Sequence, residues 1–303
     1  MGAVQTIVVV AVAYVALGAL SAFFAYSDQD AWDVWLASGL GLGLLLGRAR
    51  SDWMPVLVGA FVGAIIFEPL VGSSLTDSLG FALVEVIVTI AGGLMAAQIS
   101  DPPLRFASPR DVGAIVAGAF ALALTGAVLV GAWDYFTGRP DGWRTFRVWL
   151  LGNFVAMLLV APLVASWAQF RLKRLGTATF LSIAGGAVVW ALFLLCIHAL
   201  FSTGSAARFL QPLGVVLICL PFVFFVLVAA LWGARAATLA ALIGALIAIT
   251  QTVRGFGPFA SGNVFFDDPV LTAQGYAVAL SIAGLLLATY MEGRRAATEQ
   301  TPR

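Results

Sequence analysis

The sequence from residue 36 to residue 70 reads LASGLGLGLLLGRARSDWMPVLVGAFVGAIIFEPL and consists of two apolar segments around a charged turn. The turn contains Arg48, Arg50 and Asp52, and the segments beside it carry no charge until Glu68. Arginines between apolar segments are typical of membrane-embedded hairpins. Because lipid offers no hydrogen bonds, each backbone amide must bond within its own segment, so both segments are predicted to be helices.

Glycines in this stretch recur every four residues. Gly39, Gly43 and Gly47 share one face of the first predicted helix, and Gly59 and Gly63 share a face of the second. Small residues at this spacing let two helix backbones approach closely, which is how helices associate in lipid. We therefore expect packing faces here, with a glycine-lined substrate groove as the functional alternative.

The same pattern extends over all 303 residues, of which 61% are hydrophobic and only 10% charged. A soluble chain of this composition would lack a polar surface. We predict an all-α, polytopic transmembrane helix bundle of about ten spans, or eight if the segment at 34–47 and one other do not cross. The predicted helices occupy 6–26, 34–47, 54–71, 76–97, 111–133, 145–168, 180–201, 212–231, 236–251 and 270–291. We expect one membrane domain over 1–293 and a short polar tail over 294–303.

Positive charges alternate between the connecting segments. One side of the predicted bundle holds eleven of the 16 Lys and Arg residues, and the other holds five. By the positive-inside rule the richer side is cytoplasmic, which places both termini in the cytoplasm. The eleven are Arg48, Arg50, Arg105, Arg110, Arg171, Lys173, Arg174, Arg235, Arg294, Arg295 and Arg303. The five are Arg139, Arg144, Arg147, Arg208 and Arg254.

Glu85 is predicted to lie near the middle of the fourth helix, between Val84 and Val86. A charge at that depth costs about 3 kcal/mol or more, so this carboxyl must be paired, protonated or exposed to a wet cavity. A ligand, proton or cation site is the functional interpretation. A protonated carboxyl that bonds a neighbouring helix is the structural one.

Asn153 is a second polar residue inside a predicted helix, the sixth, where hydrogen bonding between helices is the common role of an amide. In the predicted topology Glu85 and Asn153 both lie about 12–14 Å below the outer surface. Gln251, Arg254 and Gln274 fall at or near outer helix ends. These five residues predict a polar pocket that opens outward and binds the signal or ligand.

The outer loop at 254–259, RGFGPF, requires a defined backbone, because Gly255 and Gly257 can adopt conformations that other residues avoid and the ring of Pro258 fixes its φ angle. A turn between the last two helices is the structural interpretation, and a lid over the pocket is the functional one. The two phenylalanines of the loop are expected at the membrane interface. Pro162, inside the sixth helix, is expected to kink it.

The remaining chemistry-bearing residues predict no catalysis. The sequence has none of the nucleophile, phosphate-binding or metalloprotease motifs, and its lone histidine cannot form a metal site. We therefore expect no enzyme activity, no metal, no cofactor and no nucleic-acid partner. Two cysteines are interpreted as buried, inert thiols and five tryptophans as members of the interfacial aromatic belts. These residues are Cys196, Cys219, Trp32, Trp35, Trp53, Trp143 and Trp149.

Several short motifs follow one another in a set order from about residue 30 to residue 292. They are Trp35–Leu40, Gly47-Arg48, Trp53-Met54-Pro55, Glu85, Trp149–Pro162 with Gly152-Asn153, Trp232–Arg235, the loop Gly255–Phe259, and Gln274. Together they make the chain resemble the MASE1 domain, an integral-membrane sensory domain of bacteria. The glycine- and proline-containing loop is the most specific of these motifs.

This resemblance implies a sensor for a cytoplasmic histidine kinase or diguanylate cyclase, as in two-component signal transduction. In the family such output modules commonly follow the last helix, but only eight residues follow Arg295 here. A separate partner or a longer chain is therefore expected. Ala37 and Asn153 stand where the family often has Pro and Asp, so the ligand chemistry of relatives does not transfer directly to residue 153.

We thus expect an inner-membrane sensory domain that passes an extracytoplasmic or membrane signal to the cytoplasm. Its expected partners are the lipid bilayer and a cytoplasmic kinase or cyclase partner or fused output domain, with a homo-oligomer as a further option. Two alternatives stay open. One is a secondary transporter or channel for a small solute or ion, and the other is a membrane scaffold that recruits a cytoplasmic partner.

Overall fold

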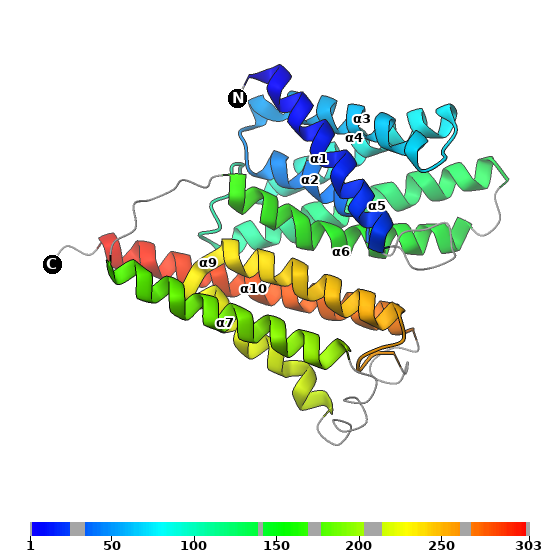
Figure 1. The fold of residues 1–303 in the computed structure, drawn as a ribbon. Coiled ribbons are helices and arrows are strands. Elements are labelled where there is room, and N and C mark those ends of the chain that lie inside the picture. Colours follow the sequence, from blue (N-terminus) through cyan, green and yellow to red (C-terminus); the bar gives the residue numbers. More distant parts are fainter. Residues whose placement is uncertain are drawn as a thin grey trace. The chain divides into compact units, whose positions relative to one another are not determined.

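A computed structural model describes residues 2–24, 34–138, 142–168, 177–202, 214–260 and 268–300. In these ranges the regular structure is entirely helical (Figure 1). The helices are α1 (Ala3–Phe24), α2 (Leu36–Leu46), the short 3₁₀ helix η1 (Arg50–Asp52), α3 (Trp53–Leu70), α4 (Leu75–Ile99), α5 (Pro109–Phe136), α6 (Gly142–Ala168), α7 (Thr177–Ser202), α9 (Gly214–Val253) and α10 (Pro269–Gln300). The predicted helical bundle is confirmed.

Eight of the described helices are long and apolar enough to cross a membrane. Two features account for the difference from ten. The 11 residues of α2 cover only about 16 Å of a hydrocarbon core about 30 Å thick. In α9, Gly233 has a non-helical backbone (φ 73°, ψ −163°) that joins two helical arms of about 20 residues each, and the chain changes direction there (Figure 1).

The chain divides into two compact units. Unit 1 consists of Met1–Leu104 and Gly113–Gln169, and unit 2 of Arg105–Val112 and Phe170–Arg303. Unit 1 contains α1 to α4, α6 and most of α5. Unit 2 contains α7, both arms of α9, and α10.

Glycine faces hold the helices of unit 1 close together. A Cβ atom added to Gly43 would lie 2.7 Å from the carbonyl oxygen of Ala161 on α6, so the two backbones are already in contact. Gly39 and Gly47 face α6 in the same way, one turn before and one turn after. On α3, Gly63 packs equally closely against Tyr14 of α1, and Gly59 against the same helix. Such contact replaces the hydrophobic effect as the force that associates helices in lipid. α6 continues through Pro162 to Ala168.

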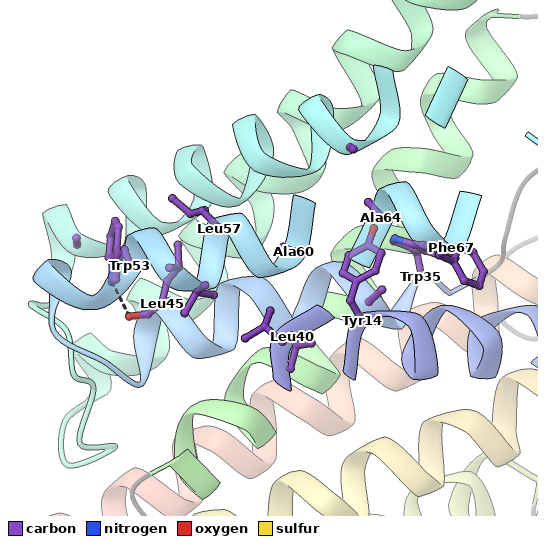
Figure 2. Close-up of a cluster of buried hydrophobic side chains, with 14 residues drawn as sticks. Tyr14, Trp35, Leu40, Leu45, Trp53, Leu57, Ala60, Ala64 and Phe67 are labelled. Atoms are coloured by element: carbon purple, nitrogen blue, oxygen red, sulfur yellow. Dashed lines mark hydrogen bonds between the residues drawn. The ribbon is translucent and has the colours of Figure 1, made fainter. Parts of the chain in front are cut away.

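The short helix α2 is held by hydrogen bonds at both ends. At its first residue the Leu36 amide donates to the hydroxyl of Ser21 on α1 (2.9 Å), which caps an N–H that the helix itself leaves free. At the other end the indole of Trp53 donates to the carbonyl oxygen of Leu45 (2.9 Å), drawn as a dashed line in Figure 2. The Leu104 amide donates to Leu46 O (2.8 Å). A helix too short to span the bilayer is thereby fixed within the protein, where irregular backbone is tolerated.

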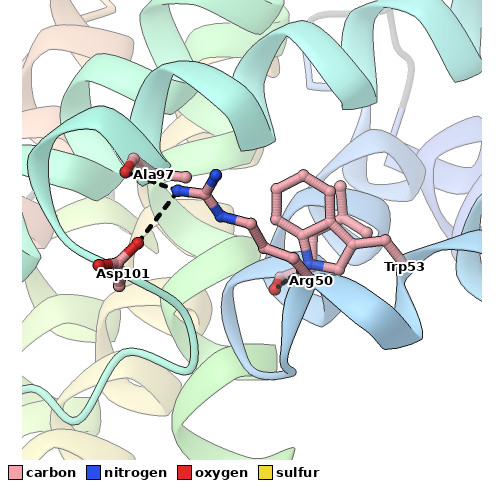
Figure 3. Close-up of polar contacts among 5 residues, drawn as sticks. Arg50, Trp53, Ala97 and Asp101 are labelled. Atoms are coloured by element: carbon pink, nitrogen blue, oxygen red, sulfur yellow. Dashed lines mark hydrogen bonds and ion pairs between the residues drawn. The ribbon is translucent and has the colours of Figure 1, made fainter.

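The turn between α2 and α3 is also tied to the end of α4. Arg50 donates from Nη2 to the carbonyl oxygen of Ala97 (2.9 Å) and to Asp101 Oδ1 (3.0 Å), as Figure 3 shows. The ion pair is exposed and contributes less than about 1 kcal/mol. The bond to Ala97 places a positive charge at a helix C-terminus, where the helix dipole favours it.

Two tryptophans assigned to the interfacial belt lie in the core of unit 1, so that interpretation is wrong for them. Trp35 packs against Tyr14 (ring centroids 6.3 Å apart) and Phe67 (5.4 Å), and Trp53 is buried beside Leu57 (Figure 2). Their indoles are used to position α2 rather than to meet lipid head groups. Trp143 is exposed as expected, Trp149 is half-buried, and Trp32 lies outside the described residues.

Aromatic side chains fill unit 2. Phe225, on the first arm of α9, packs against Phe193 of α7 (ring centroids 5.7 Å apart) and occupies the space that a Cβ at Gly284 of α10 would need. Gly244, on the second arm, meets the same Phe193. α7 and α10 therefore both contact the arms that Gly233 joins. Of the two cysteines predicted to be buried, Cys196 is half-buried and Cys219 is exposed, so the prediction is wrong for Cys219.

Candidate functional site

Three helices of unit 1 run in the same direction past one another. The residues of α2 and α4 that contact each other increase in residue number together along both helices: Ser38 contacts Glu85, Gly41 contacts Thr89, and Leu45 contacts Gly93. Along α2 and α6 the pairs rise as well: Gly39 with Ala156, Gly43 with Ala161, and Gly47 with Ala168. Because α2 is parallel to both neighbours, α4 and α6 are parallel to each other.

Glu85 lies inside this arrangement, with 4% of its surface exposed. Its Oε2 accepts a hydrogen bond from the hydroxyl of Ser38 on α2 (2.8 Å), and its Oε1 accepts a longer one from Thr89 (3.4 Å), four residues further along α4. The phenol of Tyr14 on α1 lies within hydrogen-bonding reach of the same carboxyl. Three helices thus supply hydroxyl groups to one buried acid.

The carboxyl of Glu85 lies beside the first turn of α2, since Ser38 is the third residue of that helix. Amide groups at a helix N-terminus carry partial positive charge, which stabilises a nearby carboxylate. Short or interrupted helices whose N-termini face a binding site occur in membrane transporters. The short helix α2 therefore has an electrostatic role, because its N-terminal end lies beside the buried acid.

Asn153 lies at the same level of unit 1 as Glu85. The rings of Phe81 on α4 and Trp149 on α6 stack with their centroids 6.1 Å apart and their planes 6° apart. Glu85 and Asn153 each follow their aromatic partner by four residues, so each lies one turn further along, on the face that bears the stacked ring. The stacked pair and the parallel helix directions place both residues in one layer.

Only one of the two polar atoms of the Asn153 side chain is hydrogen-bonded among the described residues. Its Nδ2 donates to the carbonyl oxygen of Trp149 in the preceding turn (3.0 Å), but its Oδ1 has no hydrogen-bond partner among the described residues. The residue is only 5% exposed. A buried acceptor without a donor costs about 1–3 kcal/mol. This atom is therefore available to a ligand that donates a hydrogen bond or carries positive charge.

Sequence analysis did not identify the three hydroxyl residues around Glu85. Thr89 carried a usable signal, since residues four apart on a helix are neighbours. Ser38 and Tyr14 carried none, because their approach to Glu85 depends on which helices are adjacent in space. The residues predicted for the site from unit 1, Glu85 and Asn153, lie in one layer of that unit.

The other three predicted site residues belong to unit 2 and lie around the end of α9. Gln251 is half-buried in the last turn of α9, Arg254 is exposed just beyond it, and Gln274 is buried on α10. Arg254 and Gln274 have interaction partners within the described chain.

The loop after α9 begins with a tight helix cap. The amide of Phe256 donates to the carbonyl oxygen of Gln251 (2.8 Å), and that of Gly255 donates to Thr252 O (3.0 Å). This pair of bonds is the Schellman motif, which requires a left-handed residue at the position of Gly255, whose φ is +81°. Gly257 is also left-handed, at +83°. Both glycines are therefore required by the backbone.

The second half of the loop packs against a cluster of aromatic side chains. Phe259, the residue after Pro258, is 1% exposed and packs against Phe201 (ring centroids 5.3 Å apart) and Tyr276 (5.5 Å). Phe222 meets Tyr276 from the first arm of α9 (5.4 Å). The expectation that both loop phenylalanines lie at the membrane interface is wrong for Phe259, which is packed in the core of unit 2. Phe256 is 42% exposed.

Near this cluster, two buried hydroxyls lack hydrogen-bond partners among the described residues. They belong to Thr252 and Tyr276. The indole N–H of Trp190 on α7 is in the same state within the described part of the chain. Across the described ranges no group of three or more His, Cys, Asp or Glu side chains could hold a metal ion. The polar chemistry of the fold is thus concentrated in hydroxyl, amide and single carboxyl groups.

Comparison with known proteins identifies the family. The sequence model of the MASE1 family matches residues 4–295, which is nearly the whole chain. No curated protein and no solved structure matches the chain. MASE1 is a membrane-embedded sensory domain and is not itself catalytic. With its eight apolar helices of spanning length, this chain is a multi-pass protein of the bacterial inner membrane. It belongs to the MASE1 family.

Proposed function

We propose that this domain detects a signal at the layer formed by Glu85 and Asn153 and passes it through α10 to a cytoplasmic output protein of the histidine kinase or diguanylate cyclase type. The observation that supports this proposal best is the length of α10. Its apolar window ends at Met291, but the helix continues to Gln300. A helix that leaves the membrane without a break is suited to transmit a rotation or shift to a partner.

The proposed mechanism is a shift between two packings of the bundle. A ligand favours one packing only to the extent that it binds that packing more tightly. Helix shifts of about 1–2 Å are sufficient in known switching proteins. In this proposal occupancy of the Glu85 layer selects the packing, and the end of α10 reports it.

The helical phase of α10 provides a direct test. A diguanylate cyclase domain is fused behind residue 300 directly, with two inserted residues, or with seven. Two residues rotate the fused domain by about 200°, whereas seven restore the phase to within about 20°. We expect Glu85→Gln to change cyclase output in the direct and seven-residue fusions and to leave it unchanged in the two-residue fusion.

The matched control is Asp111→Asn, which alters a buried acid of unit 2 that accepts the Ala107 amide (3.1 Å). It should leave cyclase output as in the parent fusion. Equal output from Glu85→Gln and its parent in every fusion, with normal protein levels, would contradict the proposed sensor.

The orientation is part of the proposal. The excess of arginine in alternate connections predicts that the end of α10 lies in the cytoplasm. A reporter that is active only in the cytoplasm, fused after Arg303, should be active. Activity of a periplasm-specific reporter at that position instead would remove the proposed contact with a cytoplasmic partner.

A transporter is the second candidate, and the geometry of α2 favours it. A short helix whose N-terminal end meets a buried acid resembles the discontinuous helices of secondary transporters. Reconstitution in liposomes separates the two functions. Solute or ion flux that Glu85→Gln abolishes would support transport, whereas a sensor should give no flux above that of empty liposomes.

A further inference from the structure

The buried acid of unit 1 has hydroxyl neighbours but no positive partner. None of the described Lys, Arg or His side chains interacts with Glu85, and the ion pair between Arg50 and Asp101 in that unit is exposed. A carboxylate enclosed by apolar helices costs several kcal/mol unless a positive charge or a full set of donors compensates it. Among its three hydroxyl neighbours, Thr89 makes a long hydrogen bond of 3.4 Å.

A second observation in the same layer points to a ligand independently. Asn153 Oδ1 is buried without a donor among the described residues, while the amide nitrogen of the same side chain is already used by Trp149 O. The group left over is therefore an oxygen acceptor. A neutral donor would satisfy Asn153 but would leave the charge of Glu85 uncompensated, whereas a cation satisfies both.

We propose that Glu85 and Asn153 bind a monovalent inorganic cation beside the N-terminal turn of α2, and this inference rests on the proposed function for its role in signalling. The groups of the layer are oxygen atoms, namely the carboxylate, the amide carbonyl and the hydroxyls of Ser38, Thr89 and Tyr14. Oxygen is the ligand that hard cations prefer.

The number of carboxylates in the layer indicates the charge of the ion that it would bind. Calcium sites are built from several carboxylates, and this layer contains one. Glu68, another acid of unit 1, accepts a hydrogen bond from the hydroxyl of Ser73 (2.7 Å) near the end of α3. It is therefore engaged outside this layer. A single positive charge balances the layer.

Thermal unfolding of the purified full chain in detergent tests this proposal without any output partner. The melting temperature is measured in sodium, potassium and lithium chloride and in N-methylglucamine chloride at equal ionic strength. A ligand that binds only the folded state stabilises it by RT ln(1 + L/Kd), where L is the free ligand concentration, so the melting temperature rises with the logarithm of that concentration once this exceeds Kd. We expect at least one of the three ions to raise it by about 4–8 °C at about 30 times its Kd, and the large organic cation to have no effect.

Two substitutions locate the ion. Asn153→Leu removes the free carbonyl and keeps the acid, and Glu85→Gln removes the charge. Each should abolish the ion-dependent rise, whereas Asp111→Asn in unit 2 should keep it in full. If Glu85→Gln does not fold, Asn153→Leu and the salt series on the unaltered chain still decide the outcome.

Three results would overturn the inference. They are equal melting temperatures in all four salts, a full ion-dependent rise in Asn153→Leu, and stabilisation that follows pH alone at fixed salt. The cyclase fusions separate this inference from the proposed sensor. If the ion binds but Glu85→Gln leaves cyclase output unchanged, the proposed sensor is refuted and the cation site is not. If cyclase output depends on Glu85 but no ion binds, the cation site is refuted and the sensor is not.

Discussion

In unit 1 the ends of α2 and the carboxyl of Glu85 have hydrogen-bond partners on neighbouring helices, whereas in unit 2 three buried polar side chains have none among the described residues. Unit 1 also packs glycine against backbone, as Gly43 does against α6. The interior of unit 2 is instead packed with aromatic side chains, such as those around Tyr276.

This contrast indicates where specificity lies. Hydrogen bonds and backbone contact fix α2 in one register, because a shift by one residue would break both its caps and its glycine seam. Aromatic packing tolerates small displacements, since rings contact one another in several geometries. Unit 1 is therefore suited to hold a defined polar site, and unit 2 to change its packing. Asn153 Oδ1 is the exception in unit 1, which is why it points to a ligand.

The largest effect is expected at the glycine seam. Gly43→Ala places a methyl group 2.7 Å from the Ala161 carbonyl oxygen, and we expect it to lower stability by about 3 kcal/mol. Gly80→Ala on α4 makes the same change in open space and should raise stability by about 0.5–1 kcal/mol through helix propensity. Thermal unfolding in detergent measures both. Similar behaviour of the two variants would show that the seam is not closely packed.

The loop glycines of unit 2 should give the next largest effects. Gly255→Ala forces alanine into a left-handed backbone, at a cost of about 1–2 kcal/mol. Gly257→Ala has the same strain and also meets Phe201, 2.9 Å from the added carbon, so it should cost more. Denaturation curves of the pair measure the difference. A smaller loss for Gly257→Ala would contradict the close packing of the loop on Phe201.

Hydroxyl deletions compare the polar groups of the two units. Ser38→Ala removes the shorter hydroxyl bond to Glu85 and should destabilise the chain by about 1–2 kcal/mol, because the acid loses a donor. Tyr276→Phe removes a hydroxyl that has no described partner and should change stability by less than about 0.5 kcal/mol, or raise it slightly. Both are read from unfolding midpoints. The reverse order of the two effects would refute the contrast.

The smallest expected effect is the difference in stability between two tryptophan substitutions. Trp53→Phe and Trp190→Phe lose the same ring volume, but only Trp53 donates to a described acceptor, Leu45 O. We expect Trp53→Phe to be the more destabilising by about 1 kcal/mol. Equal losses measured in the same detergent would mean that the cap on α2 contributes nothing.

The positions of the helices could be predicted from the sequence because apolar runs and their breakers determine them. The third helix, expected at 54–71, spans Trp53–Leu70, and the last, expected from residue 270, begins at Pro269. The α9 arms were also separated correctly at Gly233, although the backbone there differs from the turn at Gly47, whose φ is −86°.

The surroundings of each helix could not be predicted, because they depend on contacts between distant segments. Ser38 and Glu85 are 47 residues apart, and nothing in either segment indicates that α2 lies beside α4 and α6. For the same reason Trp35 and Trp53 were assigned to the membrane surface although they pack in the core. A polar residue in a helix signals a site, but its partners appear only once the helices are assembled.

A double-mutant cycle between Ser38 and Glu85 tests the central claim, that the N-terminal turn of α2 holds the buried acid. Ser38→Ala, Glu85→Leu and the double variant are compared by unfolding in detergent. The structure predicts a coupling free energy of about 0.6–2 kcal/mol between the two residues. Effects that add to within about 0.3 kcal/mol would contradict it.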